Sequence, residues 1–258
     1  MVQGGAVKMV AGVERRSMMP GLLAWMALLL AVISGSLFVW APIGYRKGEL
    51  SLDSALMQIV PLSLLAGLAA LFVVMVRLFV AWRLRSRRGK WAARLALVLA
   101  LAAIAYPLSE IQKGARLPRI HDITTDPADP PNFVDLLPLR RDAPNGEIYG
   151  GPKIAQLQAL AYPDIGPITL PFPPEAAFAK AEAAAKKLGW HIVAAVPSTG
   201  RLEATDTTIW FRFPLDIVVR IRPDGEGSRI DIRSVSRIGD ADGGANAARI
   251  RAFRAKLG

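Results

Sequence analysis

The hydrophobic positions of this chain follow two patterns, which change near residue 110. Before it, three long apolar runs cover 19–41, 55–82 and 91–108. In helical form the first run is about 34 Å long and the third about 27 Å, close to the ~30 Å hydrocarbon core of a bilayer. After residue 110, short segments alternate apolar and polar positions, which is typical of half-buried strands. We therefore expect three transmembrane helices in 19–110, followed by a water-soluble part.

The first run follows Arg15 and Arg16, as the core of a secretory signal peptide follows basic residues. With 23 uncharged residues it is too long for such a core, and two further runs follow, so we interpret it as an uncleaved helix. The second run contains Pro61 and Arg77. We expect neighbouring helices to satisfy the carbonyl that Pro61 leaves free, and Arg77 to reach the interface; a functional intramembrane charge is the alternative.

Basic residues orient the three runs. The short loop 83–94 carries six Lys and Arg residues and the tail 1–18 carries three more, whereas the first loop carries two that are offset by two acids. The positive-inside rule places the tail and the loop 83–94 in the cytoplasm, where the loop can also contact anionic lipid headgroups. Three crossings then place everything after residue 110 outside the cytoplasm. This indicates a bacterial inner membrane with a periplasmic domain.

Composition excludes several classes of site. The net charge is +11, but residues 1–113 hold 13 Lys and Arg against 4 acids, while the remainder holds 19 against 17. The excess is therefore not on the folded part, where nucleic-acid binding would need it. With no cysteine and two histidines, the chain has no thiolate zinc site, no Cys nucleophile and no His-rich metal site. We expect no metal, no cofactor and no nucleic-acid partner.

Residues 111–174 lack periodicity and are rich in proline. Within them, 121–131 consists of Asp, Thr and Pro residues that favour turns. A short helix is expected at 153–160. Five apolar side chains (Phe133, Val134, Leu136, Leu137 and Leu139) predict that this tether wraps over the folded domain and buries them.

Residues 175–258 predict an α+β domain. Pro174 and Glu175 begin a helix that ends at Gly189. Strands are expected at 190–196, 201–213, 216–222 and 228–237, with a hairpin loop at 223–227 and a closing helix at 247–257. Short connections make the strands antiparallel neighbours. We therefore expect an antiparallel sheet packed with two helices on its apolar face.

The opposite face of that sheet carries the candidate binding residues. By period-two alternation, Asp231 shares it with five arginines: Arg220, Arg222, Arg229, Arg233 and Arg237. Glu203 is a further candidate for this face. One interpretation is a cross-strand charge ladder. The other is a binding site for a phosphate or carboxylate, formed by Arg233 and Arg237 with Asn246 at the start of the closing helix. The candidate ligand-binding residues are Arg220, Arg222, Arg233, Arg237 and Asn246, although Asp240 and Asp242 can instead cap that helix.

His121, Asp122 and Asp126 are candidate acid–base residues, with turn formation as the alternative. Paired carboxylates would suit glycosidic chemistry, but the sequence does not fix their separation. His121 and Asp122 are adjacent in an extended segment and so point to opposite sides. The spacing of the aspartates in 122–135 does not match a calcium loop.

Four stretches together resemble one known family. They read DITTDPADPP, AYPDI, WFRFPLDIVVRIRP and SRIDIRSVSRIGDADGGANAARIRAF, and they extend over residues 115–258. The chain is similar to the domain-of-unknown-function family 1499, in the three-helix membrane-anchored version of bacterial relatives. That family has no settled activity, cofactor or catalytic residue, so the resemblance implies domain limits and no chemistry.

Three functional hypotheses follow. The first is a non-catalytic, membrane-anchored module that binds an anionic lipid or glycan, or a protein partner, of the cell envelope. It is favoured because no nucleophile–base constellation is present in the sequence. The second is an envelope lipid- or glycan-acting hydrolase or transferase that uses Asp122, Asp126 or His121. The third is a structural subunit of an inner-membrane complex, in which Pro61, Arg77 and small residues such as Gly67, Ala69 and Ala70 would serve helix packing.

Overall fold

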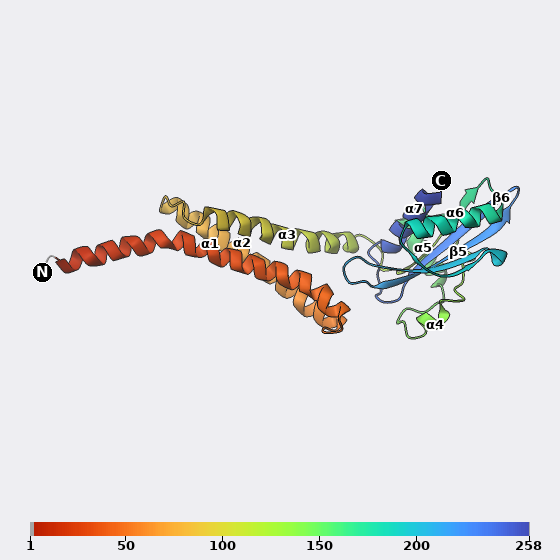
Figure 1. The fold of residues 1–258 in the computed structure, drawn as a ribbon, viewed down its shortest axis with the longest axis horizontal. Coiled ribbons are helices and arrows are strands. Elements are labelled where there is room, and N and C mark those ends of the chain that lie inside the picture. The colour runs from red at the N-terminus through yellow and green to blue at the C-terminus, as the bar shows by residue number, and fades with distance from the viewer. Residues whose placement is uncertain (1–2, 258) are drawn as a thin grey trace. The chain divides into compact units, whose positions relative to one another are not determined.

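The computed structural model describes residues 3–257, with side chains from residue 18 onward except that of Lys113. The chain divides into two compact units, Met1–Glu110 and Ile111–Gly258 (Figure 1). Each unit is described by itself.

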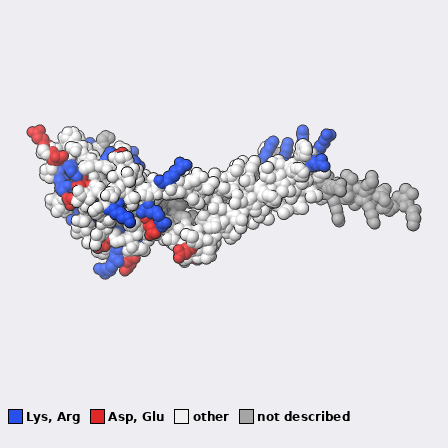
Figure 2. All heavy atoms as spheres, turned by 180° about the vertical axis from the view of Figure 1, so that it is seen from behind, with Lys and Arg blue, Asp and Glu red and all other residues white. Residues whose placement is uncertain are grey.

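The first unit is helical. Its elements are α1 (Gln3–Arg46), a π-helical turn (Ser54–Ile59), α2 (Val60–Arg83) and α3 (Lys90–Ala115), whose last turn belongs to the second unit. Within the part of the chain that the structure describes, three helices are long and apolar enough to cross a membrane: Met18–Arg46, Ser54–Arg83 and Lys90–Gln112. The three expected helices are therefore confirmed. Figure 2 shows their surface almost without charge, apart from Lys and Arg gathered near one end.

Small residues hold these helices together. The Ser34 hydroxyl of α1 donates a hydrogen bond to the Ser63 carbonyl of α2 at 2.7 Å. A Cβ at Gly67 would lie 3.0 Å from the Ser34 Oγ and 3.1 Å from Ile104 of α3, so the backbone at Gly67 closely approaches both helices. Ala70 is fully buried. Gly67 and Ala70 therefore pack helices within this chain.

The two interruptions of the second apolar run have local explanations. Pro61 lies in the first turn of α2, directly after the π-helical turn, where its missing N–H disrupts the helical pattern least. Arg77 is 6% exposed, and its guanidinium donates a hydrogen bond to the Arg88 carbonyl at 3.0 Å. Arg77 thus holds the loop that follows α2.

The second unit contains one antiparallel sheet. Its strands are β1 (Asp122–Thr124), β2 (Ile168–Leu170), β3 (His191–Val196), β4 (Arg201–Thr207), β5 (Pro214–Asp224) and β6 (Gly227–Ser236). The order is β1-β6-β5-β4-β3. β1 pairs with residues 233–235 of β6, and β2 pairs with residues 228–230 of the same strand. The helices are α4 (Leu137–Arg140), α5 (Gly151–Ala161), α6 (Pro174–Lys187) and α7 (Ala245–Leu257), with a 3₁₀ turn at Pro197–Thr199.

One face of the sheet forms the core with α6 and α7. It carries the alternate apolar positions of β5 and β6: Ile217, Val219, Ile221, Ile230 and Ile232. Phe253 of α7 stacks on Trp190 with ring centroids 5.3 Å apart. Because strand side chains alternate between faces, this packing directs the odd residues of β6 to the other side. The predicted α+β fold is confirmed.

The strand expected at 201–213 is shorter in the structure. β4 ends at Thr207, and 208–213 forms a loop closed by a hydrogen bond from the Thr208 N–H to the Phe213 carbonyl at 3.0 Å. Arg212 has a positive φ of 53°, which no strand residue adopts. Pro214 begins β5 instead of interrupting a strand, a position that proline tolerates. Ile209, Phe211 and Phe213 stand at alternate positions, which is why the sequence predicts a longer strand here.

The proline-rich segment 111–174 does more than cover the folded domain. It supplies β1 and β2, and the interpretation of 121–131 as turns throughout was wrong because β1 lies inside it. Residues 126–147, called the covering segment from here on, lie over the second face of the sheet. Phe133 and Leu136 are buried there against Val218 and Val235. The other three apolar residues expected to be buried are exposed: Val134, Leu137 and Leu139.

Candidate functional site: the charged face of the sheet

Among the described residues, arginines and acids in equal number pair between the covering segment and the sheet face beneath it. Seven arginines form ion pairs there: Arg140, Arg201, Arg220, Arg222, Arg229, Arg233 and Arg237. Their partners are seven carboxylates: Asp122, Asp126, Asp129, Asp135, Glu203, Asp216 and Asp231. The predicted arginine face is therefore a network of ion pairs, much of it removed from solvent by the protein's own chain.

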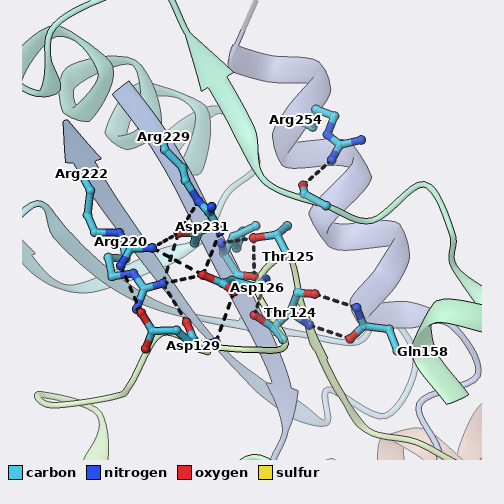
Figure 3. Close-up of polar contacts among 12 residues, drawn as sticks. Thr124, Thr125, Asp126, Asp129, Gln158, Arg220, Arg222, Arg229, Asp231 and Arg254 are labelled. Atoms are coloured by element: carbon cyan, nitrogen blue, oxygen red, sulfur yellow. Dashed lines mark hydrogen bonds and ion pairs between the residues drawn. The ribbon is translucent and has the colours of Figure 1, made fainter. Parts of the chain in front are cut away.

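Six residues near the β5–β6 hairpin form what we call the hairpin cluster: Arg220, Arg222, Arg229, Asp126, Asp129 and Asp231 (Figure 3). Arg222 and Arg229 are direct cross-strand neighbours, an arrangement that like charges disfavour. The Asp126 Oδ2 accepts hydrogen bonds from Arg220 at 3.1 Å, Arg222 at 3.4 Å and Arg229 at 2.8 Å. The carboxylates thus neutralise the paired arginines.

Asp126 reaches this position because β1 holds it there. The Thr125 N–H donates to the Ile232 carbonyl at 2.9 Å, and the Ile232 N–H donates to the Thr125 hydroxyl at 2.8 Å. Gln158 of α5 bonds both the N–H and the carbonyl of Thr124 (Figure 3). A three-residue strand and one glutamine therefore place the carboxylate.

Part of the hairpin cluster is open to solvent. The side chain of Asp129 is 62% exposed and that of Arg222 is 42% exposed, whereas Asp231 is fully buried. Burial lowers the pKa of Arg222, but its hydrogen bonds and charge interactions with Asp129 and Asp231 outweigh that effect and raise the pKa above its ordinary value. The guanidinium group therefore stays cationic while remaining accessible.

Arg233 is placed differently from the hairpin arginines. It forms two hydrogen bonds with Asp122, from Nε at 3.0 Å and from an Nη at 2.7 Å, and its side chain is 1% exposed. It also donates to the carbonyls of Pro131 and Glu147. Its donors are therefore used within the protein, where a bidentate pair is at its strongest.

Aromatic rings enclose this ion pair. The Arg233 guanidinium lies 5.3 Å from the ring centroid of Phe133 and 5.7 Å from that of Tyr149. Burial, with the charge of Asp122, raises the pKa of Tyr149 to about 12, against the opposing effect of Arg233. Tyr149 is therefore a neutral, mainly packing residue at ordinary pH.

Asp216 and Glu203 complete the attachment of the covering segment. Asp216 accepts hydrogen bonds from Arg140 of the covering segment at 2.7 Å and from Arg237 at 2.8 Å. Glu203 is fully buried and accepts the backbone N–H groups of Val134 and Leu136, each at 2.8 Å. The sequence did not predict that Asp216 and Arg140 belong to this face. The register of β5 places Asp216 on this face, but no local signal connects Arg140 to it.

Asn246 lies on the other side of the sheet. Its amide bonds the Ser234 and Ser236 hydroxyls and the His121 carbonyl. Because Ser234 and Arg233 are adjacent in β6, their side chains point to opposite faces. The structure therefore does not bring Asn246 together with Arg233. The N–H groups of Gly244 and Asn246 at the start of α7 donate to Asp242, so this carboxylate caps the helix.

The candidate acid–base residues are held by other contacts. Asp122 pairs with Arg233 and Asp126 belongs to the hairpin cluster. His121 is partly buried, and its carbonyl accepts the Ser236 N–H at 3.0 Å. Within the described residues, no group of three or more His, Cys, Asp and Glu side chains is arranged to hold a metal ion.

Comparisons with known proteins locate the family but no activity. A search of curated proteins finds no match. A solved structure, "Crystal structure of Ara h 8.0201", aligns over 35% of this chain and 93% of its own chain at 14% identity. Its TM-score of 0.26 is too low to support a structural inference. The family described as "Protein of unknown function (DUF1499)" matches residues 122–257, more than half of the chain. This span contains the whole sheet and its ion-paired face, and the chain therefore belongs to the DUF1499 family.

Proposed function

We propose that this chain is an integral membrane protein that holds its second unit outside the cytoplasm as a non-catalytic binding module. The three apolar helices and the distribution of basic residues in their loops support the membrane position and its orientation. A bacterial inner membrane with a periplasmic domain fits this arrangement. The ligand is an anion of the cell envelope, carried by a lipid headgroup or a glycan, and it binds at the hairpin cluster.

The contacts of the candidate acids support a binding role over catalysis. A general acid or base needs a carboxyl group that can exchange protons with a substrate. Asp122 instead accepts two hydrogen bonds from Arg233, and Asp126 accepts three from arginines of the hairpin cluster. Asp126 attaches the covering segment to the sheet, and Asp122 attaches β1 to β6.

One observation supports anion binding most directly: Arg222, the most exposed arginine of the hairpin cluster, is neutralised in part by an exposed carboxylate. Asp129 accepts hydrogen bonds or ion pairs from Arg220 and Arg222, each at 3.1 Å, and lies on the covering segment. A phosphate or carboxylate of similar charge can replace it without uncovering the buried Asp231. Planar guanidinium groups bind such anions with two hydrogen bonds each.

The experiment uses the full chain in phosphatidylcholine nanodiscs, incubated with vesicles that contain phosphatidylglycerol or with phosphorylated glycan beads. Arg222→Ala should weaken capture, because it removes an exposed cation of the site. Asp129→Asn should strengthen capture, because it removes the competing carboxylate. Lys187→Ala is the matched control: it removes one exposed cation from α6, on the opposite face of the sheet.

The two probes carry the same anionic group on different molecules. Capture by the vesicles indicates a lipid ligand, and capture by the beads indicates a glycan ligand. Capture that falls equally in Arg222→Ala and Lys187→Ala would show only a nonspecific charge effect. Capture that is unchanged in both Arg222→Ala and Asp129→Asn would remove the hairpin cluster as the site.

A further inference from the structure

The loop 208–213, between β4 and β5, exposes apolar side chains at one end of the second unit. Ile209 is 89% exposed and Trp210 is 39% exposed. The rings of Phe211 and Phe213 stack with centroids 5.2 Å apart, and Arg212 is exposed beside them. Exposed apolar groups gathered in this way mark a contact with another apolar phase.

The loop has a fixed form. The Phe213 N–H donates to the Thr208 hydroxyl at 2.9 Å, and the Arg212 N–H donates to the Thr208 carbonyl at 3.1 Å. Together with the bond from the Thr208 N–H to the Phe213 carbonyl, these contacts close the loop on itself. Ile209 and Trp210 are therefore held at the tip by a preformed turn, which reduces the entropy lost on binding.

The loop lies at the end of the sheet where the chain enters from α3. There the Ser236 N–H bonds the His121 carbonyl, and the Arg237 N–H bonds the Pro214 carbonyl. These bonds place the start of β1 and the start of β5 on either side of the end of β6, about 10 Å apart at the usual strand spacing. The hairpin cluster lies toward the opposite end of the sheet, next to the turn between Asp224 and Gly227.

The connection between α3 and the sheet is short. Six residues, 116–121, separate Ala115 from Asp122, and six residues extend over roughly 20 Å at most. Ile120 is already buried in the domain core, so the free connection is shorter still. If α3 crosses a bilayer, this short connection tethers the end of the domain that carries the loop 208–213 near the membrane surface where α3 emerges.

We propose that the loop 208–213 docks on the bilayer of the chain's own membrane, with Ile209 and Trp210 in the interfacial layer and Arg212 at the headgroups. Tryptophan favours this layer, and the exposed Arg116 and Arg212 complement anionic lipid. Since the short connection keeps the loop near the surface, a weak intrinsic affinity is sufficient for docking. The hairpin cluster then faces away from the membrane.

This docking is independent of the proposed anion binding, because the loop and the hairpin cluster lie at opposite ends of the sheet. The docking also does not depend on which side of the membrane the second unit occupies. The chain has no cysteine, so a single introduced cysteine can be labelled without background. Ile209→Cys carries an environment-sensitive fluorophore at the loop tip. Glu226→Cys, in the exposed β5–β6 turn, is the matched control. Both full-length variants are reconstituted in nanodiscs.

A lipid carrying a doxyl group near the headgroup should quench the label at residue 209 several-fold more than the label at 226, and iodide in the water should show the reverse order. Arg212→Cys provides a second label position if Ile209→Cys does not fold. Equal iodide quenching at the loop and at residue 226 would overturn the proposal. Protection of the loop label from both quenchers would also overturn it, because a protein surface would then cover the loop.

Discussion

Arg233 and Asp122 are separated by 111 residues in the chain, and their side chains form a two-bond ion pair at 3.0 and 2.7 Å. The pair connects β6 to β1, whose backbones are paired at the same place through Ile123 and Ser234. Both side chains are almost completely buried, at 1% and 7% exposure. The first strand of the domain is therefore attached to the longest hairpin by charge as well as by backbone hydrogen bonds.

We predict that Arg233→Ala destabilises the second unit by about 3–5 kcal/mol, because the carboxylate of Asp122 would remain buried without its partner. On the exposed sheet face that the sequence predicts, replacement of Arg233 and Arg237 by Ala would leave folding intact, but the structure buries Arg233. Urea unfolding of the full chain in detergent, followed by protease resistance of the second unit, measures the effect.

The matched control for this prediction is Arg222→Ala, which removes an arginine from the same face at a 42% exposed position. Exposed ion pairs contribute about 0–1 kcal/mol, so its unfolding midpoint should shift little. A similar shift for the two variants would contradict the distinction between a buried structural pair and an accessible binding residue.

Glu203 gives a second prediction, on the attachment of the covering segment. Glu203→Ala leaves the N–H groups of Val134 and Leu136 without their acceptor, at a cost of about 1–3 kcal/mol for buried donors. We expect protease cleavage within 126–147 well before cleavage of the sheet, as judged by mass spectrometry. Glu226→Ala, at an exposed turn, should leave the wild-type cleavage pattern. Unaltered cleavage in Glu203→Ala would show that other contacts suffice.

A third prediction concerns low pH. Hydrogen bonds from Arg251 hold the pKa of Asp164 at about 2, below its ordinary 3.8. Because the pKa is lower in the folded state, the pair stabilises the fold above about pH 4, and this contribution is lost as the pH falls toward 2. Both side chains are nearly half exposed, so the contribution is below about 1 kcal/mol.

Asp164→Asn should therefore be slightly less stable than the unmodified chain at pH 6 and should show a smaller change in unfolding midpoint between pH 4 and pH 2. The quantity to compare is the difference between the two proteins at each pH, since other carboxyl groups titrate in both. A difference that stays constant over this range would contradict the role of the Asp164–Arg251 pair.

The alternation of residues in β5 and β6 was sufficient to predict which side chains share a face. Ile230 and Ile232 lie in the core, and Arg229 and Arg233 lie on the charged side, because a strand has a period of two. The length and hydrophobicity of the three helices were equally clear, since a bilayer sets both.

Other features depend on contacts between distant residues, which a single sequence does not reveal. β1 is three residues long and is defined by its pairing with β6, not by a pattern of its own. The neutralisation of Arg237 by Asp216 requires the strand register. The loop 208–213 has apolar residues at the alternate positions Ile209, Phe211 and Phe213, as a strand can have, and its internal hydrogen bonds show that it is a turn.

The proposed function rests on the second unit lying outside the cytoplasm, and reporter fusions test this most directly. Alkaline phosphatase, which is active only outside the cytoplasm, is fused after Gly258 or inserted in the loop between α2 and α3, next to Arg88. We predict high activity for the fusion after Gly258 and none for the insertion at Arg88, with green fluorescent protein giving the opposite result. An active enzyme at Arg88 and an inactive one after Gly258 would reverse the orientation and contradict the account.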